Sequence, residues 1–546
     1  MTLPRLALPR IGLPLPPAAL AVMALAFVLP GLAGHDPWKS HDALGLGIVH
    51  AMAEGGDALA PRVAGFLWLH DAPLYHWVAL AFGRALHKLV EFHAAARLAS
   101  GAFVLLALWL LYTAARDWSH IDERRTSAAA ALLVLLGCVG LMVHAHEAVP
   151  ELASLAALCG ALAALPHART RPLAAGALFG AALGCAFLSS TWIAPASLAI
   201  AVLVAHLACR EWRTTKGLLF GIIFLTIFVA ISATWPLALR QRSPELFAAW
   251  WQLASQPQGA AAANLRYYLS VATWFAWPAW PLALWALWAL RRRLAEPRLL
   301  VPALACVASL ACLGWWGPAQ DVNMTPLLAP LALLAAQGVP ALRRGAAAAL
   351  DWFGVLTFAF FASLVWLGYV GMMTGLPPRV AANFARAAPG FAPHFELLAF
   401  LGAAALTAGW LALVLFTGPS PSRSITRWAA GMTLLWGTFA MLWMPWADYQ
   451  KSYRAVALQL REKMPPGRRC VAQKSLGVPQ AAALEIHAGI RTVPFDPRRP
   501  EACRLLIVQG SPRDEAGVPG PLWAKLAEAA RPGDRAERLR LYRLLK

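Results

Sequence analysis

The chain has 546 residues, of which 59% are hydrophobic and 14% are charged, and its mean hydropathy is +0.56. A soluble protein of this length carries about a quarter charged residues, so the composition excludes that class. The net charge of +20 does not call for nucleic acid as a partner, because basic groups beside a membrane suit anionic lipid headgroups and phosphates.

Thirteen apolar segments approach the roughly 20 residues that a helix needs to cross a bilayer. The first, at 13–33, is too long for a signal-peptide core and lacks a convincing cleavage site, so we interpret it as a retained span. The others lie near 97–116, 127–144, 148–166, 173–188, 191–209, 217–238, 272–291, 298–316, 323–342, 351–374, 395–417 and 424–444. This pattern predicts an all-α polytopic membrane protein with about 13 transmembrane helices.

Basic residues alternate between the two sides of these spans. Arg and Lys fill every second loop, whereas the short loops 145–147, 189–190 and 317–322 contain neither. This distribution follows the positive-inside rule and predicts a cytoplasmic N-terminus. The predicted external parts are the loops 34–96, 239–271 and 375–394 and the segment 447–546.

The chain thus divides into a membrane domain, 1–446, and a soluble external segment, 447–546. This segment carries 19 Lys or Arg against 10 Asp or Glu. Its helix-like runs lie at 453–463, 480–488 and 522–530, and its strand-like runs at 470–473, 505–509 and 539–544. These runs predict a small α/β domain with a docking or capping role. Cys470 and Cys503 both lie in it, where a disulfide is permitted.

The loop that follows the first span is rich in ionisable residues. Within 35–77 it contains five histidines and the acidic residues Asp36, Asp42, Glu54, Asp57 and Asp71. Ionisable groups at a membrane surface are costly unless they are solvated, paired or used, so this loop is a candidate active-site element.

Ser40, His41 and Asp42 open a predicted helix in this loop, and a carboxylate in the first turn of a helix stays ionised. Asp42 is therefore a candidate general base for an incoming hydroxyl. Asp36 is the competing candidate, and an ordinary first-turn role for Asp42 is the alternative.

A second cluster stands at the start of the fourth span and contains His144, His146, Glu147 and Glu151. Glu147 and Glu151 are four residues apart and share a helix face. With Asp36 or Asp42 they would steer a hydroxyl acceptor or hold a divalent cation. The candidate metal ligands are Asp42, Glu147 and His146, although their spacing fits no strict ligand motif.

A third cluster is basic. It contains Arg240 and Arg242 after the seventh span, and Arg266 with Tyr267 before the eighth. Arginines at an outer interface can bind a lipid-linked phosphate through two hydrogen bonds. Plain interfacial anchoring is the alternative interpretation.

The motifs of residues 35–100 resemble those of the GT-C glycosyltransferases. In the branch of the lipid A aminoarabinose transferases and protein O-mannosyltransferases, an acidic pair precedes a Gly-Asp, and a Glu-Lys-Pro-Pro-Leu-x-x-Trp segment follows. Here Gly56-Asp57 takes the place of the Gly-Asp, and the segment Ala72-Pro73-Leu74-Tyr75-His76-Trp77 takes the later place. Pro61, Gly65 and Ala96-Arg97-Leu98 also match.

The resemblance implies a transferase that moves a sugar from a polyprenyl phosphate to a hydroxyl or phosphate acceptor outside the cytoplasm. The acceptor would be lipid A, another envelope glycan or a protein, at the outer face of the bacterial inner membrane. A loop carboxylate would activate the acceptor, with Glu147, Glu151 and Asp71 as acidic partners. The basic cluster would bind the departing phosphate, because such a leaving group needs positive charge more than protonation.

The chain departs from the family pattern at several positions. The acidic pair of the family falls on His41 and Asp42, and its Glu-Lys pair falls on His70 and Asp71. A lysine often follows Phe187-Leu188 in the family, whereas this chain has Ser189-Ser190. Three interpretations remain open: Asp42 is the base, Asp36 replaces it, or the chain is a non-catalytic lipid-glycan binding or transport protein.

Overall fold

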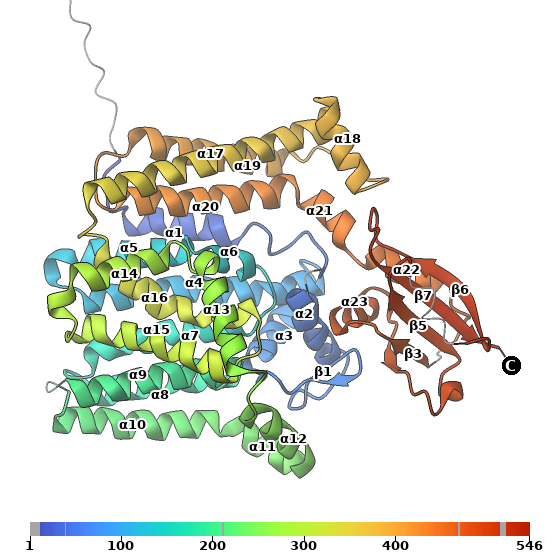
Figure 1. The fold of residues 1–546 in the computed structure, drawn as a ribbon, viewed down its shortest axis with the longest axis horizontal. Coiled ribbons are helices and arrows are strands. Elements are labelled where there is room, and N and C mark those ends of the chain that lie inside the picture. Colours follow the sequence, from blue (N-terminus) through green and yellow to red (C-terminus); the bar gives the residue numbers. More distant parts are fainter. Residues whose placement is uncertain (1–10, 39, 210–211, 468–469, 514–519, 546) are drawn as a thin grey trace, which may run out of the picture.

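The computed structural model describes residues 11–38, 40–209, 212–467, 470–513 and 520–545. Long helices form an elongated bundle, and a small α/β unit built from the last part of the chain lies at one end of it (Figure 1). The predicted fold class, a polytopic helical protein with a small α/β unit, is confirmed.

Each of the thirteen predicted spans falls on a helical segment. These helices are α1 (Pro17–Val28), α4 (Phe92–Trp118), α5 (Arg124–Leu136) with α6 (Val139–His144), α7 (Glu151–Ala164), α8 (Pro172–Ser189), α9 (Ile193–Ala208), α10 (Thr215–Ser232), α14 (Ala279–Ala289), α15 (Pro297–Trp316), α16 (Leu328–Gly338), α17 (Arg344–Thr374), α19 (Leu397–Phe416) and α20 (Arg423–Leu442). Within the described residues, six helical stretches are long and apolar enough to cross a membrane. The count of thirteen crossings stays a prediction.

Small residues allow the helices of the bundle to approach closely. Gly176 and Gly180 lie one turn apart on α8 and face α10. A Cβ atom on Gly176 would lie 2.7 Å from the carbonyl oxygen of Phe220, so only glycine fits there. In lipid, where apolar burial does not drive association, such close backbone packing holds helices together.

The segments predicted to be external gather at the end of the bundle that carries the α/β unit (Figure 1). The first loop folds into α2 (Ser40–Ala53), the hairpin β1 (Arg62–Val63) and β2 (Phe66–Leu67), and α3 (Leu74–Leu86). The others form α11 (Thr234–Arg242), α12 (Pro244–Ser255), α13 (Ala261–Phe275), α18 (Pro378–Ala387) and α21 (Met444–Lys451).

The C-terminal unit contains α22 (Arg454–Lys463), α23 (Val478–Ala488) and a five-stranded sheet. The strand order is β4 (Thr492–Pro494), β3 (Val471–Lys474), β5 (Leu505–Gly510), β7 (Arg538–Leu544) and β6 (Trp523–Ala529). Strand β3 is parallel to its neighbours, whereas β7 is antiparallel to both β5 and β6. The predicted disulfide between Cys470 and Cys503 is present.

One predicted element of this unit is wrong. Residues 522–530, predicted as a helix, form the edge strand β6. The alanines and the Lys-Glu pair of this run favour a helix locally, but antiparallel pairing with β7 buries Trp523 and Ala529 on the sheet. Tertiary pairing therefore overrides local preference here.

Helix α2 packs between the bundle and the C-terminal unit, and its glycines make this contact possible. A Cβ atom on Gly47 would lie 2.6 Å from the Cβ atom of Ala482 in α23, and Gly45 lies directly against the backbone carbonyl of Ala148. The first loop is thereby held on both sides, which fixes the orientation of the side chains at the start of α2.

Candidate functional site

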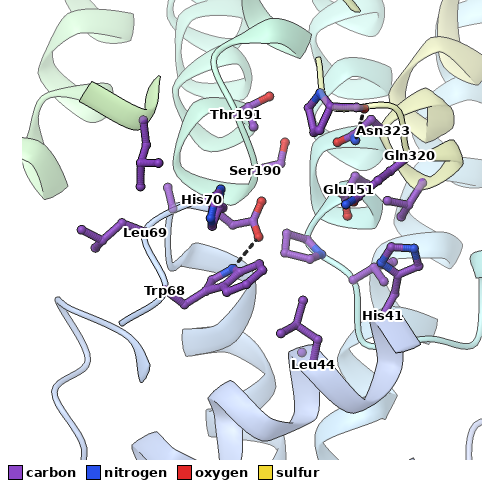
Figure 2. A pocket seen from close by; sticks show the side chains of 18 of the residues that line it. His41, Leu44, Trp68, Leu69, His70, Glu151, Ser190, Thr191, Gln320 and Asn323 are labelled. Atoms are coloured by element: carbon purple, nitrogen blue, oxygen red, sulfur yellow. Dashed lines mark hydrogen bonds between the residues drawn. The ribbon is translucent and has the colours of Figure 1, made fainter. Parts of the chain in front are cut away.

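A cavity of about 550 Å³ lies at the end of the bundle where these segments meet. Figure 2 shows its walls, with His41 and Leu44 from α2 opposite His70 and with Ser190 and Thr191 behind them. The start of α7, helix α12, the loop before η4 (Asp321–Leu327) and the start of α23 complete the lining. The C-terminal unit contributes Val478 and Pro479.

Asp71 presents a carboxylate to this cavity from the loop before α3. The indole Nε1–H of Trp68 donates a hydrogen bond to Asp71 Oδ2 at 3.0 Å (Figure 2). Burial raises the pKa of Asp71, because a low-dielectric environment disfavours the charged form. A carboxylate that is oriented by one donor and has a raised pKa suits a general base.

His41 lines the cavity opposite Asp71 and is half-buried. Burial lowers the pKa of His41, so the imidazole is neutral at physiological pH. Its ring meets the ring of His144 edge-on at 5.9 Å. The resemblance noted for the first loop implies an acidic residue at this position, whereas this chain has an imidazole there.

His144 links the two acidic residues behind His41. Its Nδ1 lies 2.9 Å from Glu147 Oε2, and its Nε2 lies 3.7 Å from Asp321 Oδ2. The proximity of His144 lowers the pKa of Asp321. Asp321 is not among the residues predicted from the sequence. The loop 317–322 contributes to that prediction only through its lack of Lys and Arg.

Glu151, the first residue of α7, also lines the cavity and is 6% exposed. The positive end of the helix dipole favours a carboxylate at this position. Ser190 lies beside it in the lining and shares a hydrogen bond of 2.7 Å with Ser154. The structure therefore brings Asp71, Glu151 and His41 together around one cavity.

The structure places Asp42, the predicted base, outside the cavity lining. Asp42 is 1% exposed. Arg97 donates to both of its oxygens, from Nε to Oδ1 at 3.1 Å and from Nη2 to Oδ2 at 2.8 Å. The backbone N–H of Ala148 donates to Oδ1 at 2.8 Å. A carboxylate that is enclosed in this way anchors α2 and cannot reach an acceptor.

Asp36, the competing candidate, also lies outside the cavity lining. This residue is 5% exposed and accepts hydrogen bonds from Arg454 and from Ser452 Oγ, the latter at 2.6 Å. Burial opposes its ionisation, but these bonds outweigh that effect and hold the pKa of Asp36 at about 2. Its backbone N–H donates to Asp448 at 2.8 Å. Asp36 therefore fastens the first loop to the C-terminal segment.

The predicted metal ligands Asp42, Glu147 and His146 do not form a site. Asp42 is bound by Arg97, and His146 Nε2 contacts the carbonyl oxygen of Phe27 at 3.0 Å. Among the described residues, the group whose ligand atoms lie within 4.8 Å of one another is Asp36, Glu91 and His93. Arg454 already neutralises the charge of Asp36 there, which makes this group a poor ligand set for a cation.

The predicted phosphate-binding residues lie outside the cavity lining. Arg240 is exposed and lies over the Phe247 ring at 5.9 Å. Arg242 approaches Asp57 at 3.6 Å, and Arg266 is exposed. Tyr267 packs against the next tyrosine at 5.3 Å. Among the described lining residues there is no Lys or Arg.

Five tryptophans line the cavity together with these polar groups. They are Trp68, Trp192, Trp235, Trp250 and Trp316. Indole rings offer apolar faces with a polar N–H, which suits a sugar or a prenyl chain. Their spacing along the chain contains no signal for this site, because they come from five different segments.

Curated relatives and solved structures point to one fold. The chain is 28% identical over 367 residues to undecaprenyl phosphate-α-4-amino-4-deoxy-L-arabinose arabinosyl transferase of Pseudomonas savastanoi pv. phaseolicola, over 65% of this chain and 66% of the relative. It is also 28% identical over 235 residues to undecaprenyl phosphate-α-4-amino-4-deoxy-L-arabinose arabinosyl transferase 1 of Sodalis glossinidius. This match covers 42% of this chain and 41% of the relative. The matches thus span just under two thirds and about two fifths of these relatives. No protein-family model matches.

The solved structures cover almost the whole chain. ArnT from Cupriavidus metallidurans in the apo state superposes with a TM-score of 0.68 and 18% identity, over 96% of this chain and 97% of that one. The same protein bound to undecaprenyl phosphate gives a TM-score of 0.65. The chain has the fold of ArnT. The resemblance inferred from the first loop is therefore confirmed.

Within this ArnT-like fold, the described residues contain six helical stretches that are long and apolar enough to cross a membrane. The changed positions of the first loop, His41, His70 and Asp71, all line the cavity. The positions that match the family in sequence, such as Arg97, support the loop from behind.

Proposed function

We propose that this chain is a glycosyltransferase that moves a sugar from a polyprenyl-phosphate donor to a hydroxyl or phosphate acceptor. The observation that carries the proposal is the cavity with Asp71, Glu151 and His41, built on an ArnT-like fold. The names of the curated relatives support undecaprenyl phosphate as the lipid carrier and lipid A modification as the context. The acceptor is a lipid or glycan of the cell envelope.

The reaction requires one bond to form as another breaks. The acceptor oxygen bonds to the anomeric carbon of the sugar, the bond from that carbon to the phosphate oxygen breaks, and polyprenyl phosphate departs. For a hydroxyl acceptor, the proton passes to the Asp71 carboxylate, which Trp68 holds in place. Asp71 replaces Asp42 as the catalytic candidate, and Glu147 and Glu151 are its acidic partners.

The donor would lie along the aromatic side of the cavity. Trp235 and Trp250 form this wall, and α11 carries Arg240 and Arg242 on its exposed surface directly before α12. An arginine at the rim would meet the phosphate while the prenyl chain stays in the lipid. The acidic, lysine-free lining suits a sugar that carries an amino group, as named for the relatives.

The charge distribution supports an orientation in the membrane. We place the N-terminus in the cytoplasm and the cavity, the loops 34–96, 239–271 and 375–394 and the domain 447–546 in the periplasm, since the basic loops belong on the cytoplasmic side. A polyprenyl-phosphate sugar presented at the outer face would then reach the cavity directly.

Mass spectrometry of membrane lipids and envelope glycans tests this function. In cells that lack the protein, a polyprenyl-phosphate sugar should accumulate and one glycan should lose one sugar, and the wild-type gene should reverse both changes. A non-catalytic binding or transport protein is the alternative, favoured by the absence of Lys and Arg from the described lining. Donor binding by the purified protein without turnover, in the presence of envelope acceptors, would establish that alternative.

A further inference from the structure

His76 stands out among the buried histidines of this region. It lines the cavity from the first turn of α3 and is 1% exposed. Neither of its ring nitrogens has a hydrogen-bond partner among the described residues. By contrast, His35 contacts two backbone carbonyl oxygens at 2.8 and 2.9 Å, and His144 contacts the Glu147 carboxylate at 2.9 Å.

An imidazole in this position is an unsatisfied hydrogen-bonding group. Burial of a polar group without a partner lowers the stability of the folded protein. Buried polar groups that persist in this way therefore point to a partner that binds there. Because His76 lines a cavity large enough for a sugar, the partner is expected to be a ligand.

The protonation state of His76 restricts the chemistry of this ligand. Burial lowers the pKa of His76 to about 3, so the ring is neutral and offers one donor and one acceptor. An ionised phosphate offers only acceptors, and an ammonium group offers only donors. A hydroxyl group offers both, so it satisfies a neutral imidazole better than either charged group.

We propose that His76 binds a hydroxyl group of the transferred sugar and so determines which sugar the protein accepts. This inference rests on the proposed glycosyl transfer, because it takes the cavity as the sugar site. His76 and Asp71 come from one short segment and line the same cavity. A sugar held by His76 is therefore presented to the side from which Asp71 activates the acceptor.

Thermal unfolding of the purified protein in detergent, without added lipid, gives the first readout. His76→Leu removes the unsatisfied group, so its melting temperature is expected to equal or exceed that of the wild type. Tyr75→Phe is the matched control on the same helix. Tyr75 is fully buried, and its hydroxyl shares a hydrogen bond of 2.6 Å with Ser100. Tyr75→Phe is expected to lower the melting temperature.

Binding of two lipids gives the second readout. Undecaprenyl phosphate is compared with undecaprenyl phosphate that carries 4-amino-4-deoxy-L-arabinose. The wild type should prefer the sugar-bearing lipid. In His76→Leu the ratio of the two affinities should fall about tenfold, as expected for the loss of one buried hydrogen bond. Its affinity for bare undecaprenyl phosphate should stay the same. His76→Gln, which keeps a donor and an acceptor, should retain part of the preference, and Tyr75→Phe all of it.

The outcomes separate this inference from the proposed function. A wild type that transfers the sugar while His76→Leu melts at a lower temperature and keeps the full preference would overturn the role of His76 alone. A wild type that binds both lipids equally and transfers no sugar would overturn the proposed function, and the role of His76 with it. Loss of preference in a stable His76→Leu protein supports both.

Discussion

Asp36, Asp42 and Asp71 come from the same loop after the first span but lie in two different kinds of surroundings. Asp36 and Asp42 are each bound by an arginine through two oxygens. Asp71 faces the cavity and receives one hydrogen bond from an indole. Hydrogen bonds from Arg454 and Ser452 hold the pKa of Asp36 at about 2, whereas burial raises the pKa of Asp71.

The difference teaches that a bidentate arginine distinguishes the aspartates that hold the fold together from the aspartate that faces the cavity. A bidentate guanidinium satisfies the carboxylate and removes its ability to accept a proton. Asp71 is left available because His70, and not a lysine, precedes it and because the described cavity lining contains no Lys or Arg. Four substitutions test this division.

The largest expected effect is on catalysis at Asp71. Asp71→Asn removes the proposed base while it keeps the size of the side chain, and it should lower the rate of sugar transfer by about 10²–10⁴-fold. Initial rates with a lipid-linked donor in detergent measure this. Glu54→Gln, at an exposed acid of the same loop, should retain nearly full activity. Equal rates for Asp71→Asn and wild type would exclude Asp71 as the base and make Glu151 the next candidate.

Loss of Asp42 should lower the stability and the amount of the folded protein, but not the rate of sugar transfer by the protein that folds. Asp42→Ala leaves the fully buried Arg97 without its counterion, which should cost about 3–5 kcal/mol. The amount of protein in the membrane and its melting temperature measure this. The double variant Asp42→Leu with Arg97→Met should be more stable than Asp42→Ala, because it leaves no unpaired charge. A stable but inactive Asp42→Ala would restore Asp42 as a catalytic candidate.

A smaller effect is expected at the junction. Arg454→Met removes the guanidinium that binds Asp36 and should cost about 2 kcal/mol, as for hydrogen bonds to a charged group. Limited proteolysis should then cut the C-terminal unit from the bundle faster. Lys451→Met, at an exposed basic residue of the same segment, serves as the control. Unchanged cleavage of Arg454→Met would show that other contacts, such as that of Gly47 with Ala482, hold the unit in place.

The smallest effect is a pH dependence of this junction. Burial and the charge of Asp36 raise the pKa of Asp448 to about 7. The folded protein therefore binds a proton that the unfolded chain has already lost, and stability falls as pH rises from about 4 to 7. Melting temperatures across this range should show the fall in the wild type. Asp448→Asn should remove most of the fall, and an unaltered pH profile in this variant would exclude Asp448 as its source.

Local patterns in the sequence were sufficient for the architecture and for the region of the site. Apolar segments and the alternation of basic loops predicted the helices, and α2 begins at Ser40 as predicted. The motifs of the first loop predicted the fold family and placed the site there. These features depend on short-range preferences and on solvation, which a single sequence records directly.

The role of each acid could not be predicted, because it depends on contacts between distant segments. Arg97 lies 55 residues from Asp42, and Arg454 lies 418 residues from Asp36. The residues near each aspartate in the sequence contain no pattern that indicates its arginine partner. Asp321 and the tryptophans of the cavity were missed for the same reason, and β6 was assigned as a helix because its pairing with β7 lies outside the local run.

The participation of Pro479 in a wall that also contains Ser40 has a consequence for the synthesis of the protein. The ribosome makes these two residues more than four hundred positions apart, so the nascent chain carries an incomplete cavity until α23 has been translated and has docked on α2. A chain that stops before α23 has every helix of the bundle but lacks one wall of the pocket. The cavity therefore acquires its last wall only when the C-terminal part of the chain has been synthesised and has folded.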